Sequence, residues 1–327
     1  MKRKYLILII TLILILSSIF LIKSQKSKGI AKSIVLKPET IIDIPYGDNK
    51  NEVGFNWLND KSGICLYPQT FFIGKDKNIY ILDSVKKRVL VIDENSEFVK
   101  SIDLNCIGSK RLGDLVIDSQ SKIYILDPIL GKIFTCVDGK INIYERLNYL
   151  FPENPHFITL NIDYSDNLFL GYFCNNELIY KKIHNGEKLN INFSTSKVDN
   201  ENNFYLLKND PIGTNKIWLI KKDSQGKEIK KILIPDFERI DLKLIGVDNK
   251  FRPYLLMKRI NYEFIDILIF EDESNSFSLY SLNFTETDLI ENAIFTSGYF
   301  YRVTENGEIW FMFITKNGLR MLKFKVE

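Results

Sequence analysis

A short motif recurs six times along the chain and constrains its fold more than any other feature. Each copy has a β-branched residue and, seven positions later, an aromatic residue between nonpolar neighbours. The pairs are Ile73 and Tyr80, Ile117 and Tyr124, Ile162 and Phe169, Val198 and Tyr205, Val247 and Tyr254, and Val303 and Trp310. In four copies an Asp follows the β-branched residue, where its side chain can accept hydrogen bonds from the N–H groups of a turn (Asp118, Asp163, Asp199, Asp248). Each copy therefore predicts a β-hairpin.

The spacing of the copies indicates how the hairpins are assembled. Successive copies start 44, 45, 36, 49 and 56 residues apart, which is about the length of one four-stranded propeller blade. Residues 88–92 and 319–326 alternate with a period of two, whereas helical repeats would show apolar spacings of three and four. The sequence therefore predicts an all-β fold, a six-bladed β-propeller of four-stranded blades over residues 35–327.

Ring closure can be predicted by counting strands. After Trp310 there is room for only one more strand, near residues 318–326, so the last blade would hold three. Residues 40–46 (TIIDIPY) precede the first repeat and have the pattern of a strand. We expect this segment to supply the missing outer strand, because a closed ring leaves no long exposed sheet edge.

The first repeat resembles a known type. Residues 68–98 are similar to the NHL-type repeat of NHL/TolB-like six-bladed propellers. The matching residues are Pro68, Ile73, Asn78, Ile79, Tyr80, Asp83, Arg88 and Val89, and Asp127 repeats the position of Asp83. The resemblance weakens beyond residue 145. It also fails at the turn between the first two strands of this repeat, where the NHL type usually has an Asp followed by a Gly and this chain has Gly74 and no later Gly. It implies a propeller, a fold that hosts binders, lactone hydrolases and lyases alike.

The N-terminus carries a separate signal. After Lys2, Arg3 and Lys4, residues 5–22 are almost entirely apolar and would reach about 27 Å as a helix, close to the hydrocarbon thickness of a bilayer. We expect residues 1–22 to form a signal anchor, a transmembrane helix, and residues 23–34 to be a polar linker. The basic N-terminus favours an inside orientation, so the propeller would lie on the extracytoplasmic side of the cell membrane. The alternative is cleavage of the segment and secretion.

Charge argues against nucleic acid as a partner. Six of the 44 Lys and Arg residues lie in residues 1–28, which leaves 38 against 41 Asp and Glu, a net charge of −3 for the remainder. A domain of this kind lacks the positive field that attracts phosphate backbones.

The sequence assigns no catalytic residue. Only two histidines are present, His156 and His184, in different repeats, which is too few for a zinc lyase site. No nucleophile elbow, phosphate loop or zinc-protease motif occurs. Cys65 and Cys106 belong to neighbouring predicted connections, and we do not expect a bridge between them.

An enzymatic alternative remains open. Calcium-dependent hydrolases of lactone-like small molecules need only a few carboxylate and amide oxygens at the channel mouth of a propeller. The residues that could supply them here are Asp114, Asn161, Asp210 and Asp241. Asp and Asn are equally common in structural turns, so calcium is expected only under this alternative.

Our main prediction is a binding or scaffold module without a cofactor. The connections between the fourth strand of one blade and the first strand of the next share one face of a propeller. These connections contain basic and aromatic residues that we expect to be exposed and to bind the partner, because such residues dominate recognition surfaces. They are Lys110, Arg111, Tyr149, Phe151, His156 and Arg239. The expected partners are the membrane, through residues 1–22, and an unknown protein, peptide or glycan.

Overall fold

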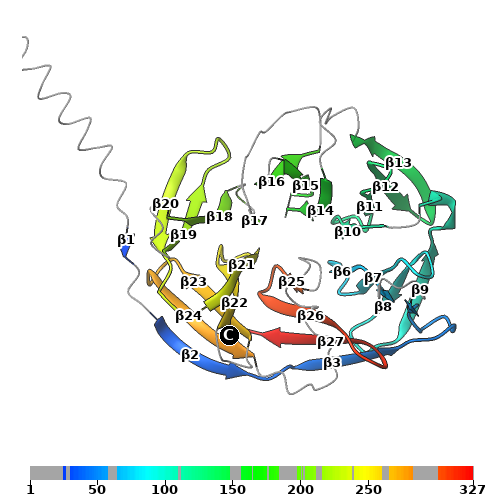
Figure 1. The fold of residues 1–327 in the computed structure, drawn as a ribbon, viewed down its shortest axis with the longest axis horizontal. Coiled ribbons are helices and arrows are strands. Elements are labelled where there is room, and N and C mark those ends of the chain that lie inside the picture. Colours follow the sequence, from blue (N-terminus) through cyan, green and yellow to red (C-terminus); the bar gives the residue numbers. More distant parts are fainter. Residues whose placement is uncertain are drawn as a thin grey trace, which may run out of the picture.

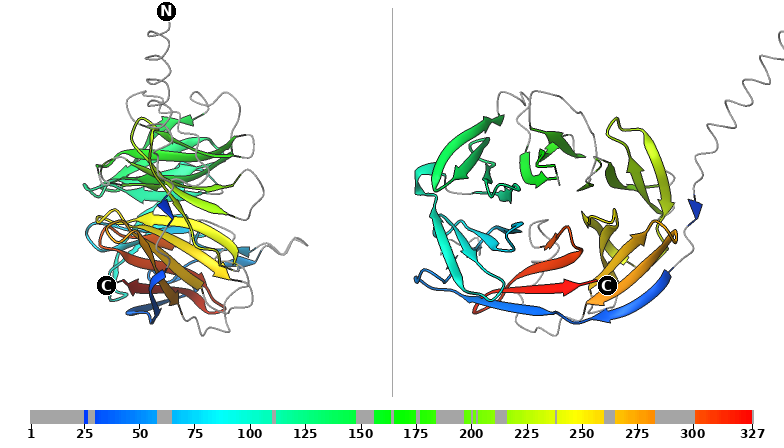
Figure 2. Two further views of the ribbon diagram at one scale, coloured as in Figure 1. Left: turned by 90° about the vertical axis from the view of Figure 1, so that its left-hand side faces the viewer. Right: turned by 180° about the vertical axis from the view of Figure 1, so that it is seen from behind.

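Six blade-like β-sheets stand around a common centre in the computed structural model (Figure 1). The structure describes residues 25–26, 30–57, 65–109, 112–147, 156–163, 165–174, 177–183, 197–199, 201, 203–210, 216–237, 239–259, 265–282 and 301–326. Figure 2 shows the same ring from its edge and from behind. The predicted six-bladed, all-β propeller is confirmed.

In each blade the strands follow one another antiparallel from the centre outward. The first blade has β6 (Thr70–Ile73), β7 (Ile79–Asp83), β8 (Arg88–Ile92) and β9 (Phe98–Asp103). The second has β10 (Asp114–Ile117), β11 (Ile123–Asp127), β12 (Lys132–Val137) and β13 (Lys140–Arg146), after a short 3-10 helix, η1 (Asn105–Ile107). In the third, the described strands are β14 (His156–Ile162), β15 (Leu168–Cys174) and β16 (Glu177–Lys182).

The remaining blades carry additional strands on their outer edges. The fourth has β17 (Lys197–Val198), β18 (Phe204–Asn209), β19 (Ile217–Lys222) and β20 (Glu228–Leu233), with β1 (Gln25–Lys26) outside β20. The fifth has β21 (Arg239–Val247), β22 (Pro253–Arg259), β23 (Ile265–Glu271) and β24 (Ser276–Leu282), with β2 (Ile30–Leu36) outside β24. The sixth has β25 (Tyr301–Val303), β26 (Glu308–Ile314), β27 (Gly318–Lys325) and β3 (Thr40–Pro45). A two-stranded sheet of β4 (Asn56–Trp57) and β5 (Cys65–Leu66) precedes the first blade.

The repeated Asp forms the hairpin turn as predicted. Asp118 Oδ1 accepts hydrogen bonds from the N–H groups of Gln120 and Lys122, at 3.0 and 2.9 Å. Asp163, Asp199 and Asp248 accept the corresponding pair of N–H groups in their own turns. In the first blade, which has Gly74 at this position, Asp76 accepts from Asn78 instead. The recurring residue therefore satisfies turn amides that would otherwise lack a partner.

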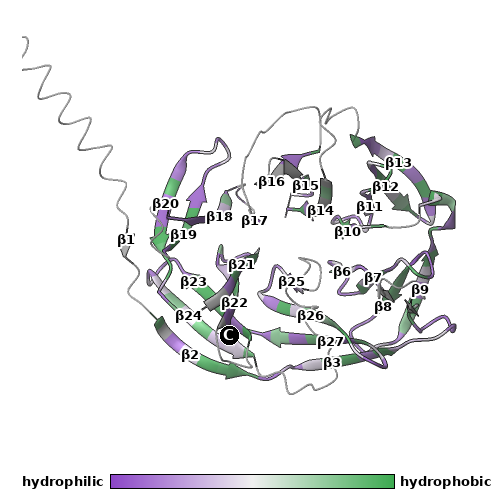
Figure 3. Cartoon of the chain, in the orientation of Figure 1, coloured by the Kyte–Doolittle hydropathy of each residue, from purple (hydrophilic) through white to green (hydrophobic). Residues whose placement is uncertain are grey.

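The repeated aromatic residues pack between neighbouring blades. Tyr80, Tyr124, Phe169, Tyr205, Tyr254 and Trp310 are all at most 7% exposed. Five of them belong to hydrophobic clusters that include residues of the following blade. The sixth, Phe169, contacts Phe204 of the fourth blade edge to face, with ring centroids 6.4 Å apart. Hydrophobic residues lie along the strands of the blades, interspersed with hydrophilic ones (Figure 3). The core is therefore a series of layers between blades.

The sixth blade is closed by the segment predicted for that role. β3 pairs antiparallel with β27, from Gly318 opposite Pro45 to Lys323 opposite Thr40. Ile42 and Ile44 on β3 are buried in the layer between the sixth and first blades, whereas Ile41 is 56% exposed. The predicted outer strand and the closed ring are confirmed.

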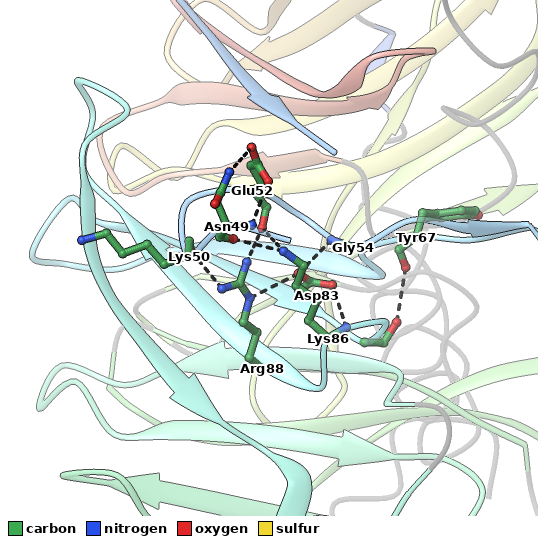
Figure 4. Close-up of polar contacts among 9 residues, drawn as sticks. Asn49, Lys50, Glu52, Gly54, Tyr67, Asp83, Lys86 and Arg88 are labelled. Carbon is green, nitrogen blue, oxygen red and sulfur yellow. Dashed lines mark hydrogen bonds and ion pairs between the residues drawn. The ribbon is translucent and has the colours of Figure 1, made fainter. Parts of the chain in front are cut away.

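The chain that leaves β3 is held by the turn between β7 and β8 (Figure 4). Lys86 Nζ donates to the carbonyl oxygens of Asn49 and Glu52, at 3.1 and 3.0 Å, and Arg88 donates to those of Lys50 and Glu52. The buried carboxylate of Asp83 orients the guanidinium group of Arg88, because Asp83 Oδ2 accepts a hydrogen bond from Arg88 Nε. The closing strand is thereby attached to both the last and the first blade.

The N-terminal segment is associated with the ring before β3 begins. β2 pairs parallel with β24 from Ile30 to Leu36, so the last part of the expected linker, residues 30–34, lies on the edge of the fifth blade. In Figure 1 this segment runs along the outside of the fifth and sixth blades. Within the described part of the chain, no helix is long and apolar enough to span a bilayer, and the predicted helix of residues 1–22 lies outside that part.

Candidate functional site in the central channel

The innermost strands enclose a cavity of about 370 Å³. Its wall includes residues of β6, β10, β14, β17, β21 and β25, one strand from each blade. It extends to the turns that follow β6, β14 and β25, where Gly74, Asp163 and Thr304 line it. These turns lie on the face opposite to the connections between blades, because they join the other ends of the same strands.

Six equivalent residues form a ring in the channel wall. Each directly precedes the β-branched residue of its repeat, and all six line the cavity: Phe72, Val116, Asn161, Lys197, Gly246 and Arg302. Phe72 and Val116, from the first two blades, make one side apolar. Asn161, Lys197 and Arg302, from the third, fourth and sixth blades, make the remainder polar. The channel is therefore amphipathic, although the repeat itself is nearly symmetric.

Gly246 allows the ring to close tightly between the fifth and sixth blades. A Cβ atom at this position would lie 2.5 Å from Cβ of Val303, on the neighbouring inner strand. Any side chain would force β21 and β25 apart. The close approach of these strands therefore depends on glycine.

Arg302 connects three blades across the channel. Its Nε donates to the carbonyl of Phe71 at 3.1 Å, and its Nη2 donates to Thr70 Oγ1 at 3.1 Å and to Asp114 Oδ1 at 3.0 Å. Asp114 is fully buried and also accepts from Thr159 Oγ1 and from the N–H of Leu160. The ion pair thus links β25 to β10 across the first blade.

Lys197 is the second cation of the channel. It is partly buried, and its Nζ donates to Asn161 Oδ1 at 3.2 Å. Burial and, to a smaller extent, the nearby charge of Arg302 lower the pKa of Lys197 to about 8, although the charge of Asp114 opposes this change. Among the described residues no carboxylate lies within ion-pair distance of Lys197.

The acidic residues that line the outer part of the cavity have partners of their own. Glu94 and Glu308 pair with Lys323, at 3.5 and 2.9 Å, and Glu305 pairs with Lys75 at 3.5 Å. Asp166 accepts from the N–H and hydroxyl of Ser119 in the neighbouring blade. Asp163, which also lines the cavity, accepts from the N–H groups of Ser165 and Asn167. Among the described residues, none of these carboxylates forms an ion pair with Lys197.

Two of the four predicted calcium ligands lie in or beside the channel. Asn161 lines it, and Asp114 lies beside it on β10, but their oxygen atoms are engaged by Lys197 and Arg302. Asp241 on β21 pairs with Lys243 at 3.4 Å, and Asp210 follows β18. In the described ranges, no three His, Cys, Asp or Glu residues are grouped as a metal site would require. The two channel residues do not fit a calcium ion, because Lys197 and Arg302 already engage their oxygen atoms.

Most of the predicted binding surface is not described. Lys110, Arg111, Tyr149 and Phe151 lie outside the described residues, and so do the side chains of His156 and Arg239, which begin β14 and β21. That surface stays a prediction. Cys106 is exposed and has a free thiol, and the side chain of Cys65 lies outside the described residues.

Sequence reasoning did not single out Lys197 or Arg302. The signal was nonetheless present, because both occupy the position before the β-branched residue of the repeat, which holds Phe72, Val116 or Gly246 in other copies. A basic residue at an inner-strand position is costly to bury unless it is paired or binds a ligand.

Comparison with known proteins supports the fold. No family profile matches the chain, and no curated protein matches its sequence. Among solved structures, regucalcin from Agrobacterium tumefaciens, described as a calcium-binding protein, is 11% identical, covers 91% of this chain and 98% of its own, and gives a TM-score of 0.52. A member of the DUF4221 family from Bacteroides vulgatus is 11% identical, with coverages of 89% and 98% and a TM-score of 0.50. At this identity the likeness shows the propeller fold alone.

Proposed function

We propose that this protein is a ligand-binding module whose central channel takes a small molecule without a metal ion. The observation that carries the proposal is the ring of inner-strand residues, in which Lys197 and Arg302 face a cavity with an apolar side. Small-molecule sites are typically concave cavities of about 300–1,000 Å³ that combine apolar side chains with placed polar groups, and this cavity has that size and both kinds of side chain.

A calcium-assisted hydrolase is the second candidate. It is favoured by the position of Asp114 and Asn161 at the channel, on the inner strands of adjacent blades. Calcium would have to displace the ammonium group of Lys197 and the guanidinium of Arg302 from these oxygens. Two fixed cations beside the site would also repel the ion.

A thermal-shift screen separates these candidates. The full-length chain is purified in detergent, and a metabolite library is tested in the presence of EDTA. We expect compounds that raise the unfolding midpoint of the wild type but not that of Asn161→Phe, whose larger side chain would fill the channel. If no compound stabilises the chain in EDTA and calcium alone does, the hydrolase becomes the better assignment.

We further propose that residues 1–22 tether the propeller to the cell membrane, with the blades outside. The support is the apolar segment and its basic N-terminal flank. An NHL-type identity of the repeats and the protein, peptide or glycan partner of the blade connections also stay proposals, supported by the residue patterns of the sequence alone.

A further inference from the structure

We propose that the channel selects a monocarboxylate with an apolar body, whose carboxylate binds between Lys197 and Arg302 while the body packs against Phe72 and Val116. This inference rests on the proposed small-molecule site and names the chemical class of its ligand.

The charge balance beside Lys197 and Arg302 favours an anion. Arg302 and Asp114 neutralise each other. The other carboxylates that line the cavity lie nearer the turns: Glu94 and Glu308 share Lys323, Glu305 pairs with Lys75, and Asp163 and Asp166 accept hydrogen bonds from neutral groups. Lys197 contributes one further positive charge, and its partner Asn161 is neutral. An amine held partly out of water without a counter-ion is stabilised when an anion binds beside it.

The hydrogen-bond donors match a carboxylate. Lys197 Nζ has three donors, and Asn161 takes one of them. Arg302 uses Nε and Nη2 within the protein, and for Nη1 no partner occurs among the described residues. Asn161 uses its carbonyl oxygen toward Lys197, which leaves its amide N–H groups as neutral donors. Charge-assisted bonds from Lys and Arg to a carboxylate are among the strongest available.

The number of charges distinguishes a carboxylate from a phosphate. One uncompensated cation balances one negative charge, whereas a phosphate monoester carries nearly two at neutral pH. Phe72 and Val116 line the wall formed by the first two blades, and the apolar surface that Phe72 presents to the cavity would be left in contact with water by a small hydrophilic anion. The ligand is therefore an organic acid with an aryl or branched alkyl group.

The test compares acids with their uncharged amides. Isothermal titration calorimetry at pH 7 is carried out on the full-length chain in detergent with phenylacetate, hydrocinnamate and isovalerate, and with the three corresponding primary amides. We expect at least one acid to bind, and to bind about tenfold or more tightly than its amide, because a charged hydrogen-bond partner is lost. Inorganic phosphate should bind more weakly than the best acid.

Matched variants assign the effect to the channel. Lys197→Met keeps the length of the side chain and should remove the preference for the acid, and Lys197→Arg should restore most of it. Lys227→Met, at an exposed turn of the fourth blade, should leave acid binding unchanged. Circular dichroism melts verify that each variant is folded.

The outcomes separate this inference from the function on which it rests. Equal binding of acids and amides, lost in Asn161→Phe, would retain the small-molecule site and reject the carboxylate subsite. If phosphate binds better than every acid, the assigned ligand class is wrong. Failure of acids, amides and phosphate alike to bind would overturn the monocarboxylate assignment, and the metabolite screen described above would then decide whether the channel binds a small molecule.

Discussion

Asp114 shows how a single residue can serve both the closure of the ring and the chemistry of the channel. The repeat in the sequence predicts that Asp114 lies near an inner strand. It also predicts the role of Asp118 and Asp248, because these residues accept hydrogen bonds from N–H groups of their own turns. Its partner Arg302 lies 188 residues away and reaches it across another blade. No pattern in the sequence specifies that contact, because it depends on which side chains the closed ring brings together from the sixth and second blades.

Replacing Arg302 by Met should destabilise the fold strongly. The change leaves the fully buried carboxylate of Asp114 without its cation, which typically costs about 3–5 kcal/mol. Urea unfolding followed by circular dichroism measures the loss, and adding Asp114→Asn should recover part of it. Lys75→Met, which breaks the exposed pair with Glu305, should cost at most about 1 kcal/mol. Equal losses in the two single variants would refute the role of Arg302.

Binding of an acid should weaken above about pH 8, where Lys197 loses its proton. An anion binds the protonated amine, so affinity is constant below the pKa of the free protein and falls as the pH rises through it. The other titratable groups that line the cavity are Lys75, Lys77, Glu94, Asp163, Asp166, Arg302, Glu305 and Glu308. Lys197→Met separates the contribution of these groups from that of Lys197. When this variant is titrated with the acid from pH 6 to pH 10, its affinity should show no decline near pH 8. An unshifted lysine would hold its affinity to about pH 10.

Among the elements, β3 was predictable because strand counting left one place empty in the sixth blade. The same reasoning could not find β2, since residues 23–34 taken together are mostly polar, basic or small, and the fifth blade had no empty place to fill; the pairing of β2 with β24 is made by backbone groups. An additional parallel strand on an outer edge leaves little trace in side-chain pattern. Composition therefore predicted a linker where the structure has a strand.

The two faces of β3 offer a matched test of closure. Ile42 is buried between the sixth and first blades, and Ile41, its neighbour, is 56% exposed. Ile42→Ala should lower the free energy of unfolding by about 2–5 kcal/mol, and Ile41→Ala should change it by about 0.5 kcal/mol or less. Chemical denaturation of both variants gives the comparison. If they unfold together with the wild type, β3 does not hold the ring closed.

For the whole molecule, the repeat predicted the number of blades, the closed ring and the layers between blades, because these follow from a periodic pattern. The position of the proposed ligand site did not follow from the repeat. Function in a propeller depends on the residues that break the symmetry, and Phe72, Lys197 and Arg302 occupy the same register as one another.

Protease accessibility tests the proposed orientation of the molecule. Added to intact protoplasts, a protease should degrade residues 35–327 while a cytoplasmic marker protein remains whole. The basic residues before the apolar segment favour this arrangement by the positive-inside rule. Complete protection of the blades would reverse the orientation, and recovery of the domain in the medium would indicate cleavage of the segment.

A crystal structure of the full-length chain grown with both hydrocinnamate and calcium chloride would show which of the two occupies the channel. We expect the carboxylate beside Lys197 and Arg302, the phenyl group against Phe72 and Val116, and the bond between Arg302 and Asp114 intact. A calcium ion coordinated by Asp114 and Asn161, with the two basic side chains displaced, would contradict this expectation.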